Sequence, residues 1–306
     1  MSGEHVRWLS DVGWVAVYEV GEAVRTRLLQ LILLAYAGAI GGACWLFTFI
    51  LRELETPIAL AMGLPATRRP GAMVTQLLEG DELRSMFRPL VASGAELDQL
   101  LDRPLLGLWA GAAAMALLPL VVLFAASGSI ATEVRSRSIR YLACRASRVS
   151  IGLGKLAGQL LLAGVAAALG VLVAWVAGMT LMTGNDPLAL LGELTLRTLL
   201  ACAYALPFAG LGLAASAWVP NANGARVLAT GAFLALPITG YYLDVFAKGE
   251  VAERAADLLR LFVATTLWAP LWSLDPGTAL VAVAHCGVLA VVYYAVGHAR
   301  LAVRDL

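Results

Sequence analysis

Gly152, Gly154 and Lys155 are the first candidates for chemistry, because glycines followed by a lysine can form a phosphate-binding loop. Such a loop uses the pattern GxxxxGK followed by Ser or Thr, after a buried strand, so that backbone N–H groups and a helix start surround the phosphates. Here Lys155 is followed by Leu156, the position five before Gly154 is Val149, and no strand is predicted upstream. We therefore predict that this stretch binds no nucleotide, and we expect no ATPase motif, no enzyme activity and no bound cofactor.

Other reactive side chains are too scattered to form a catalytic or metal site. His5, His285 and His298 make no metal-ligating pattern with carboxylates. Asp186 and Glu193 are expected in a short external turn without partners. The four cysteines are widely spaced and form no CxxC pair, so we interpret them as small apolar residues. The sequence therefore predicts no metal site.

The composition is that of an integral membrane protein. Of 306 residues, 60% are apolar and 14% are charged, with a mean hydropathy of +0.80, whereas soluble domains carry about 25% charged residues. Glu4, Asp11, Glu19 and Glu22 interrupt the first 27 residues, so we expect no cleavable signal peptide in this stretch. We expect membrane lipid around the protein and no nucleic acid partner.

Apolar runs predict the fold class. A membrane-spanning helix needs about 20 apolar residues, and five runs reach that length without an internal charge. They are 28–51, 105–127, 156–182, 198–219 and 277–299. A sixth, shorter run at 227–243 contains Pro237. We predict an all-α integral membrane protein with six transmembrane helices, an amphipathic N-terminal helix at 1–27, and spans three to six within 156–299.

The distribution of basic residues predicts the orientation, because Lys and Arg favour cytoplasmic loops. Twelve of the 22 basic residues flank the spans on the side of the amino terminus: Arg7, Arg25, Arg27, Arg135, Arg137, Arg140, Arg145, Arg148, Lys155, Arg226, Arg300 and Arg304. We therefore expect a multi-pass protein of the bacterial cytoplasmic (inner) membrane with both termini cytoplasmic. Residues 128–155 would be a cytoplasmic region and 300–306 a cytoplasmic tail. The segment 52–104 also has six arginines, but it is longer and carries eight acids.

Two segments are expected on the external side. In 52–104, apolar residues recur at helical spacing, which predicts a small helical segment that either covers the bundle or contacts an extracytoplasmic protein. The segment near 248–275 begins with an amphipathic helix and ends in a corner with Trp268 and Trp272, which are expected at the membrane interface. The apolar face of this helix consists of Val251, Ala255, Leu258, Leu259 and Phe262.

The segment 133–148 is dense in charge. Thr132 is a candidate N-cap for a short amphipathic helix that starts at Glu133. The predicted apolar side of this helix consists of Ile139, Leu142, Ala143 and Ala146. The arginines on its other sides are typical of a topology signal or of contact with anionic lipid headgroups.

Several stretches resemble a known family. The run LLPLVVLFAASGSIATEVRSRSIRYLACRASRVSIGLGKLAGQ resembles the second span, cytoplasmic turn and third span of type-2 ABC exporter permeases. VGWVAVYEVGEAVRTRLLQLILLAY resembles their amphipathic helix and first span, and the ending HARLAVRDL is similar to their basic tails. Ser138 and Ile139 stand where the family often has Gly-Thr, and Arg145 and Ala146 stand where it often has Pro before the SR pair.

The resemblance implies an ATP-driven permease with a separate ATP-binding subunit. In that family the turn between spans two and three docks on this subunit as a coupling helix, so 133–148 would transmit ATPase closure to the spans, assisted by the N-terminal helix. The implied ATPase-coupling residues are Glu133, Arg135, Arg137, Arg140, Arg145, Arg148, Glu19, Glu22 and Arg25. A second permease copy, identical or related, is also implied, and Gly38, Gly41 and Gly42 are candidates for close helix contact.

Other readings remain open. A mechanotransmission or scaffold subunit would use 52–104 to act on an external protein. An ion-coupled carrier usually has ionisable residues within its spans, whereas the predicted spans contain no Asp, Glu, Lys or Arg. His285 lies deep in a predicted span and is interpreted as a hydrogen-bonded packing residue. The sequence leaves the transported substrate open.

Overall fold

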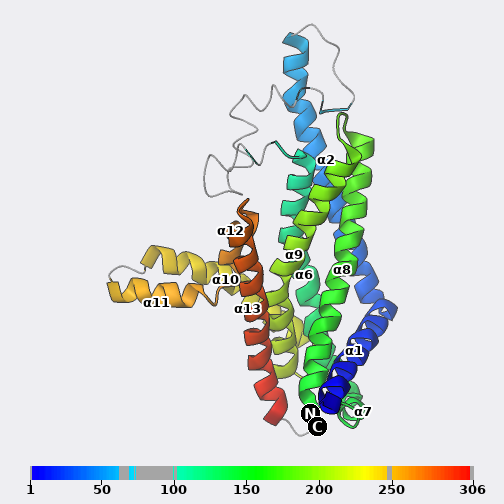
Figure 1. Cartoon of the computed structure of the whole chain (residues 1–306), viewed down its shortest axis with the longest axis vertical. Coiled ribbons are helices and arrows are strands. Elements are labelled where there is room, and N and C mark those ends of the chain that lie inside the picture. The colour runs from blue at the N-terminus through cyan, green and yellow to red at the C-terminus, as the bar shows by residue number, and fades with distance from the viewer. Residues whose placement is uncertain are drawn as a thin grey trace.

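The computed structural model describes residues 2–61, 69–71, 73, 99, 102–246 and 250–303, and every regular element within these ranges is helical (Figure 1). The prediction of a helical segment within 52–104 therefore falls mostly outside the described residues.

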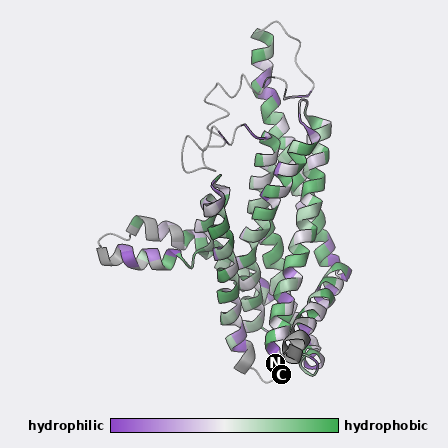
Figure 2. Cartoon of the chain, viewed as in Figure 1, coloured by the Kyte–Doolittle hydropathy of each residue, from purple (hydrophilic) through white to green (hydrophobic). Residues whose placement is uncertain are grey.

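Five helices in the described part of the chain are long and apolar enough to cross a membrane. They are α2 (Arg27–Ala61), α6 (Leu105–Ser136), α8 (Arg148–Leu181), α9 (Pro187–Trp218) and α13 (Pro276–Val303). They coincide with the five long predicted runs, which confirms an all-α, multi-pass membrane protein. Figure 2 shows hydrophobic residues along these helices. Figure 1 shows that α13 ends at the same end of the bundle as α1 (Ser2–Arg25), which we call the terminal face, and that the α8–α9 connection lies at the opposite, distal face.

Helix α9 is central to the bundle, because it packs on α6, α8 and α13. Both α6 and α9 are apolar on most sides, as expected for helices that other helices surround. Their close approach depends on Gly212, where a Cβ atom would lie 2.8 Å from the Cβ of Ala126. Leu118, Phe208 and Leu213 fill the core at this contact and are fully buried.

The sixth predicted span stays a prediction. Residues 227–243 fall in α10 (Ala222–Phe246), which is not among the five spanning helices. Pro237 lies inside α10, and an internal proline removes a backbone hydrogen bond and favours a kink. In Figure 1 the end of α10 and α11 (Glu250–Arg260) project together from the side of the bundle.

The return from α11 to the bundle differs from the sequence expectation. The chain returns through the 3₁₀ helix η2 (Ala264–Leu267) and α12 (Trp268–Trp272). On the predicted apolar face of α11, Leu259 and Phe262 are exposed, whereas the side chains of its other three members lie outside the description. The predicted interface residue Trp272 is fully buried instead, and Trp268 is half-buried in edge contact with Tyr204.

The predicted N-terminal helix is α1, which runs obliquely beside α8 at the terminal face (Figure 1). It buries Val15, Ala16 and Glu19. Thr26 separates α1 from α2, and its hydroxyl donates to the Ala23 carbonyl at 2.7 Å. Helix α2 then continues to Ala61, beyond the predicted end of the first span at residue 51.

Candidate functional site at the terminal face

A buried lysine joins three helices at the terminal face. Lys155 of α8 is 1% exposed. Its Nζ donates to Glu19 Oε2 of α1 at 2.6 Å, to Glu133 Oε1 of α6 at 2.8 Å, and to Ser129 Oγ of α6 at 3.0 Å. Because an ammonium group has three N–H donors, these contacts use all of them.

Helical spacing explains why these side chains meet. Ser129 and Glu133 are four residues apart on α6, and Lys155 and Gln159 are four residues apart on α8, so each pair lies on one face of its helix. Gln159 is 1% exposed, and its Nε2 donates to Glu19 Oε1 at 3.0 Å. Glu19 is therefore held by two residues of α8. We call Glu19, Ser129, Glu133, Lys155 and Gln159 the Lys155 network.

The glycines of the excluded phosphate loop bring α1 close to α8. A Cβ atom at Gly154 would lie 2.5 Å from the Cβ of Val15, and one at Gly158 would lie 2.8 Å from the Cβ of Glu19. Such distances are too short for packed side chains. The small-residue spacing that brings membrane helices together therefore also seats Glu19 against Lys155.

The Lys155 network is negative. Two carboxylates, Glu19 and Glu133, share one ammonium, which sums to one net negative charge. Taking charges out of water costs several kcal/mol per ion, so loss of any partner leaves an uncompensated buried charge. Burial raises the pKa of the nearby Tyr18 hydroxyl on α1, and the charges of Glu22 and Glu133 raise it further.

The connection between α6 and α8 is compact and anchored. Helix α6 ends because Arg137 adopts a left-handed backbone with φ of 60°. A short helix α7 (Ile139–Ala143) follows, and the Ser147 hydroxyl caps α8 by accepting from the Ser150 N–H at 3.1 Å. Three buried apolar residues hold the connection against α8: Leu142, Ala146 and Ile151.

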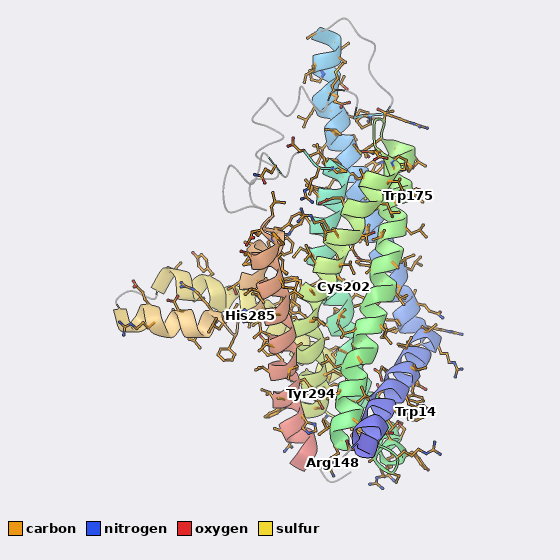
Figure 3. The ribbon with its side chains drawn as sticks, viewed as in Figure 1. Trp14, Arg148, Trp175, Cys202, His285 and Tyr294 are labelled. Atoms are coloured by element: carbon orange, nitrogen blue, oxygen red, sulfur yellow. The ribbon has the colours of Figure 1, made fainter. Side chains whose placement is uncertain are left out.

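The last turn of α6 and this connection together present an exposed basic surface. Arg135, Arg137, Arg140 and Arg145 are all exposed, and Tyr141 among them is 80% exposed. We call these five residues the arginine surface. Figure 3 shows Arg148, at the start of α8, and Trp14, on α1, at the same end of the molecule.

The structure divides the predicted coupling residues into two groups. Glu19 and Glu133 meet on Lys155, and Glu22 lines a cavity beside them. Arg25 ends α1 and is exposed, as are the arginines of the arginine surface, whereas Arg148 is half-buried.

Two local predictions were wrong. No helix starts at Glu133, which lies within α6, and Ala143 is exposed rather than on the apolar side of the connection. Lys155 and Gln159 were missed as partners. Their four-residue spacing beside Gly154 and Gly158 was the available signal.

A second buried charge cluster lies toward the distal face and corrects a further prediction. Glu193 lies within α9, not in a turn without partners, and it pairs with Arg197 at 2.7 Å and with Arg103 at 3.0 Å. The Arg197 guanidinium lies 4.5 Å from the centre of the Trp272 ring. Glu193 and Arg197 precede the predicted span 198–219, and α9 includes them because it starts earlier, at Pro187. We call Arg103, Glu193, Arg197 and Trp272 the distal cluster.

Two of the histidines considered as candidate metal ligands or catalytic groups are hydrogen-bonded within the bundle. His285 is hydrogen-bonded through Nε2 to the Leu261 carbonyl at 2.8 Å, in agreement with a packing role. His298 contacts the Tyr294 hydroxyl at 3.1 Å. Within the described ranges, no three His, Cys, Asp or Glu side chains gather in a way that could hold a metal ion.

Comparison with known proteins adds no assignment: no protein family matches the chain, and no curated protein matches it.

Proposed function

We propose that the chain is the permease subunit of an ATP-driven ABC transporter, and that its arginine surface docks on a separate ATP-binding subunit. One observation carries this proposal. An exposed arginine cluster lies on the short connection between two spanning helices, directly beside a buried network that joins these helices to α1. The terminal face is then cytoplasmic, and α10 supplies the sixth span.

The geometry supports a mechanical role for the connection. Glu133 lies one turn before the end of α6, and Lys155 lies two turns after the start of α8. Because Lys155 binds Glu133 and Glu19 simultaneously, displacement of the arginine surface moves α6, α8 and α1 together. A packed and ion-paired contact transmits such a movement better than a flexible loop does.

The chemistry of the surface indicates an acidic partner. Arginine forms planar, bidentate pairs with carboxylates, and such pairs hold an interface in register. Tyr141 supplies an exposed aromatic ring among these charges, and aromatic residues with arginines are typical of interface centres.

Copurification tests the docking. The tagged chain would be coexpressed with candidate ATP-binding ABC subunits from the same genome, and the yield of complex with the subunit that binds the wild type would be measured for Arg137→Ala with Arg140→Ala. We expect complex yield to fall at least tenfold, because truncating one side of a buried charge pair costs about 2 to 5 kcal/mol. Glu133→Ala is a weaker test, because Glu133 is paired within the chain.

A matched control removes two exposed arginines elsewhere, Arg69→Ala with Arg254→Ala. It should leave complex yield and coupled ATP hydrolysis unchanged. If the arginine surface contacts only lipid, each lost arginine should give a small graded loss of about 1 kcal/mol in affinity for anionic lipid, with normal complex yield. That result would remove the proposed docking role.

A second candidate function is mechanotransmission to an external protein. Glu55, within α2, is fully buried, and its Oε1 accepts hydrogen bonds from the Gly71 and Met73 N–H groups at 2.8 and 3.2 Å. Gly71 and Met73 are thereby tied directly to the distal end of the first spanning helix. Glu55→Gln should uncouple ATP hydrolysis from the effect on an external partner if this function holds, while leaving ATPase docking intact.

A further inference from the structure

A cavity of about 280 Å³ opens beside the Lys155 network. It lies between the α1–α2 junction, α6, α8 and the start of α10. Pockets that enclose drug-sized ligands are mostly about 300 to 1,000 Å³. This cavity therefore fits a small polar group rather than a whole amphiphile.

Two buried acceptors in the polar wall of the cavity have no donor among the described residues. Lys155 directs its three N–H groups to Glu19, Ser129 and Glu133. Glu133 Oε2 and Gln159 Oε1 consequently have no hydrogen-bond partner among the described residues, although Gln159 is 1% exposed. Both residues line the cavity. Buried acceptors of this kind fit a ligand that donates hydrogen bonds.

The charge of this wall selects a cation. Glu22 also lines the cavity, so Glu19, Glu22 and Glu133 face one lysine, which sums to two net negative charges. These carboxylates are not gathered closely enough to coordinate a metal ion within the described structure. An ammonium group satisfies both requirements, because it is positive and has three N–H donors.

The opposite wall indicates what is attached to the ammonium. Arg226 lines the cavity from α10, and its Nε has no hydrogen-bond partner among the described residues, although its Nη1 donates to Asn223 at 3.0 Å. A guanidinium in this position suits a phosphate. Leu28 and Phe124 form an apolar rim and are 45% and 37% exposed. Exposed apolar side chains on spanning helices contact lipid tails.

We propose that this cavity binds the headgroup of a membrane lipid with a primary ammonium and a phosphate, of the phosphatidylethanolamine type. The ammonium binds Glu133 and Gln159, the phosphate binds Arg226, and the acyl chains leave past Leu28 and Phe124. The site requires no ATP-binding subunit, so it can be tested on the chain alone and its failure would leave the proposed transport function unaffected.

Lipid competition on the purified full-length chain is the first test. Native mass spectrometry would compare retention of phosphatidylethanolamine and phosphatidylcholine with identical acyl chains, offered in equal amounts. We expect phosphatidylethanolamine to be retained about tenfold more strongly, because the trimethylammonium of phosphatidylcholine has no N–H donor and one charged hydrogen bond is worth about that factor. Equal retention would overturn the proposal and leave a water-filled cavity.

Two variants separate the ammonium contact from the phosphate contact. Glu133→Gln should lower phosphatidylethanolamine retention about tenfold, to the level of phosphatidylcholine. Arg226→Gln should lower retention of both lipids by a similar factor and preserve their ratio. Arg226 lies outside the Lys155 network, so this variant tests the site even if Glu133→Gln fails to fold. An unchanged ratio in a folded Glu133→Gln protein contradicts the ammonium assignment.

The control variant is Glu253→Gln, which removes an exposed carboxylate on α11 and should change neither lipid. Soluble O-phosphoethanolamine distinguishes a lipid from a free metabolite. It should compete at least a hundredfold more weakly than the lipid, because it lacks the chains that contact the apolar rim. Equal competition would overturn the lipid assignment.

Discussion

The Lys155 network and the distal cluster are both buried ion pairs in an apolar bundle, but they are built in opposite ways. At the terminal face one cation serves two carboxylates that come from two other helices, separated from it by 136 and 22 residues. At the distal cluster one carboxylate serves two cations, one of which is four residues away on the same helix. The first arrangement therefore joins three helices. The second mainly neutralises charge within α9 and links that helix to Arg103, just before α6.

The comparison predicts that Lys155 has the largest effect on stability. Lys155→Met leaves Glu19 and Glu133 facing each other with no cation, and breaking a buried pair in this way costs about 3 to 5 kcal/mol. Thermal unfolding of the purified protein in detergent would measure the loss. Adding Glu19→Gln and Glu133→Gln to Lys155→Met should recover part of it, because no uncompensated charge then remains. A loss under about 0.5 kcal/mol for Lys155→Met would contradict the central role of this lysine.

Arg197→Met should cost less, about 1 to 3 kcal/mol, even though Arg197 is as buried as Lys155. The reason is that Glu193 keeps Arg103 as a partner, at 3.0 Å. The same unfolding assay compares the two variants, and Arg103→Gln, at a side chain 38% exposed, serves as the control that should change little. If Arg197→Met lowers stability more than Lys155→Met does, the loss of stability is not determined by whether the remaining carboxylates keep a cationic partner.

The contact between α1 and α8 gives the third prediction. Gly154→Val places a side chain where Val15 already lies, so α1 should detach, with a loss of about 1 to 3 kcal/mol from overpacking. Limited trypsin cleavage after Arg25 would report detachment as faster removal of α1. Gly164→Val is the matched control on α8, because no atom lies within 4 Å of its added Cβ. Equal cleavage rates in the two variants would show that the close approach at Gly154 does not hold α1.

The second permease copy stays a prediction. Substitutions on α2 that should weaken a dimer, with little effect on the stability of the single chain, can test it. Gly38 and Gly42 have open space where a Cβ would stand, whereas Gly41 would contact Val173 of its own chain. A close contact between copies through α2 should therefore weaken in Gly38→Leu with Gly42→Leu, while stability of the single chain changes little. Mass measurement in nanodiscs would detect the loss of dimer. An unchanged dimer would place the contact elsewhere.

These regions also show what the sequence could reveal. Five spans were predictable, because a run of about 20 apolar residues can be recognised from consecutive positions of the sequence, without knowledge of the fold. Glu19 and Glu133 were expected at one functional site through a family resemblance, but their shared partner Lys155 was interpreted as a topology signal, since pairing across 136 residues requires the fold. Trp272 was expected at the membrane interface, because a sequence does not show that its ring lies against the buried guanidinium of Arg197. The end of α6 was misplaced because its stop is Arg137 in a left-handed conformation, a position that usually holds glycine.

The smallest expected effect belongs to Asp275, an exposed carboxylate three residues after Trp272. Substituting it tests whether burial, rather than charge alone, makes the two clusters contribute strongly to stability. Asp275 precedes α13 and accepts hydrogen bonds from the Thr278 hydroxyl and from the N–H groups of Thr278 and Gly277, which hold the pKa of its carboxyl below the usual range. Because the folded-state pKa lies below that of the unfolded chain, the contribution to stability is present above a pH of about 4 and is lost as the pH falls through the folded-state pKa. The unfolding temperature of the wild type should therefore exceed that of Asp275→Ala at pH 7 by a few degrees at most, and the difference should shrink steadily as the pH is lowered below about 4. A difference that does not shrink with falling pH would mean that Asp275 acts through contacts other than its ionised carboxylate, and a difference as large as that of Lys155→Met would show that burial is not what separates the clusters from an exposed cap.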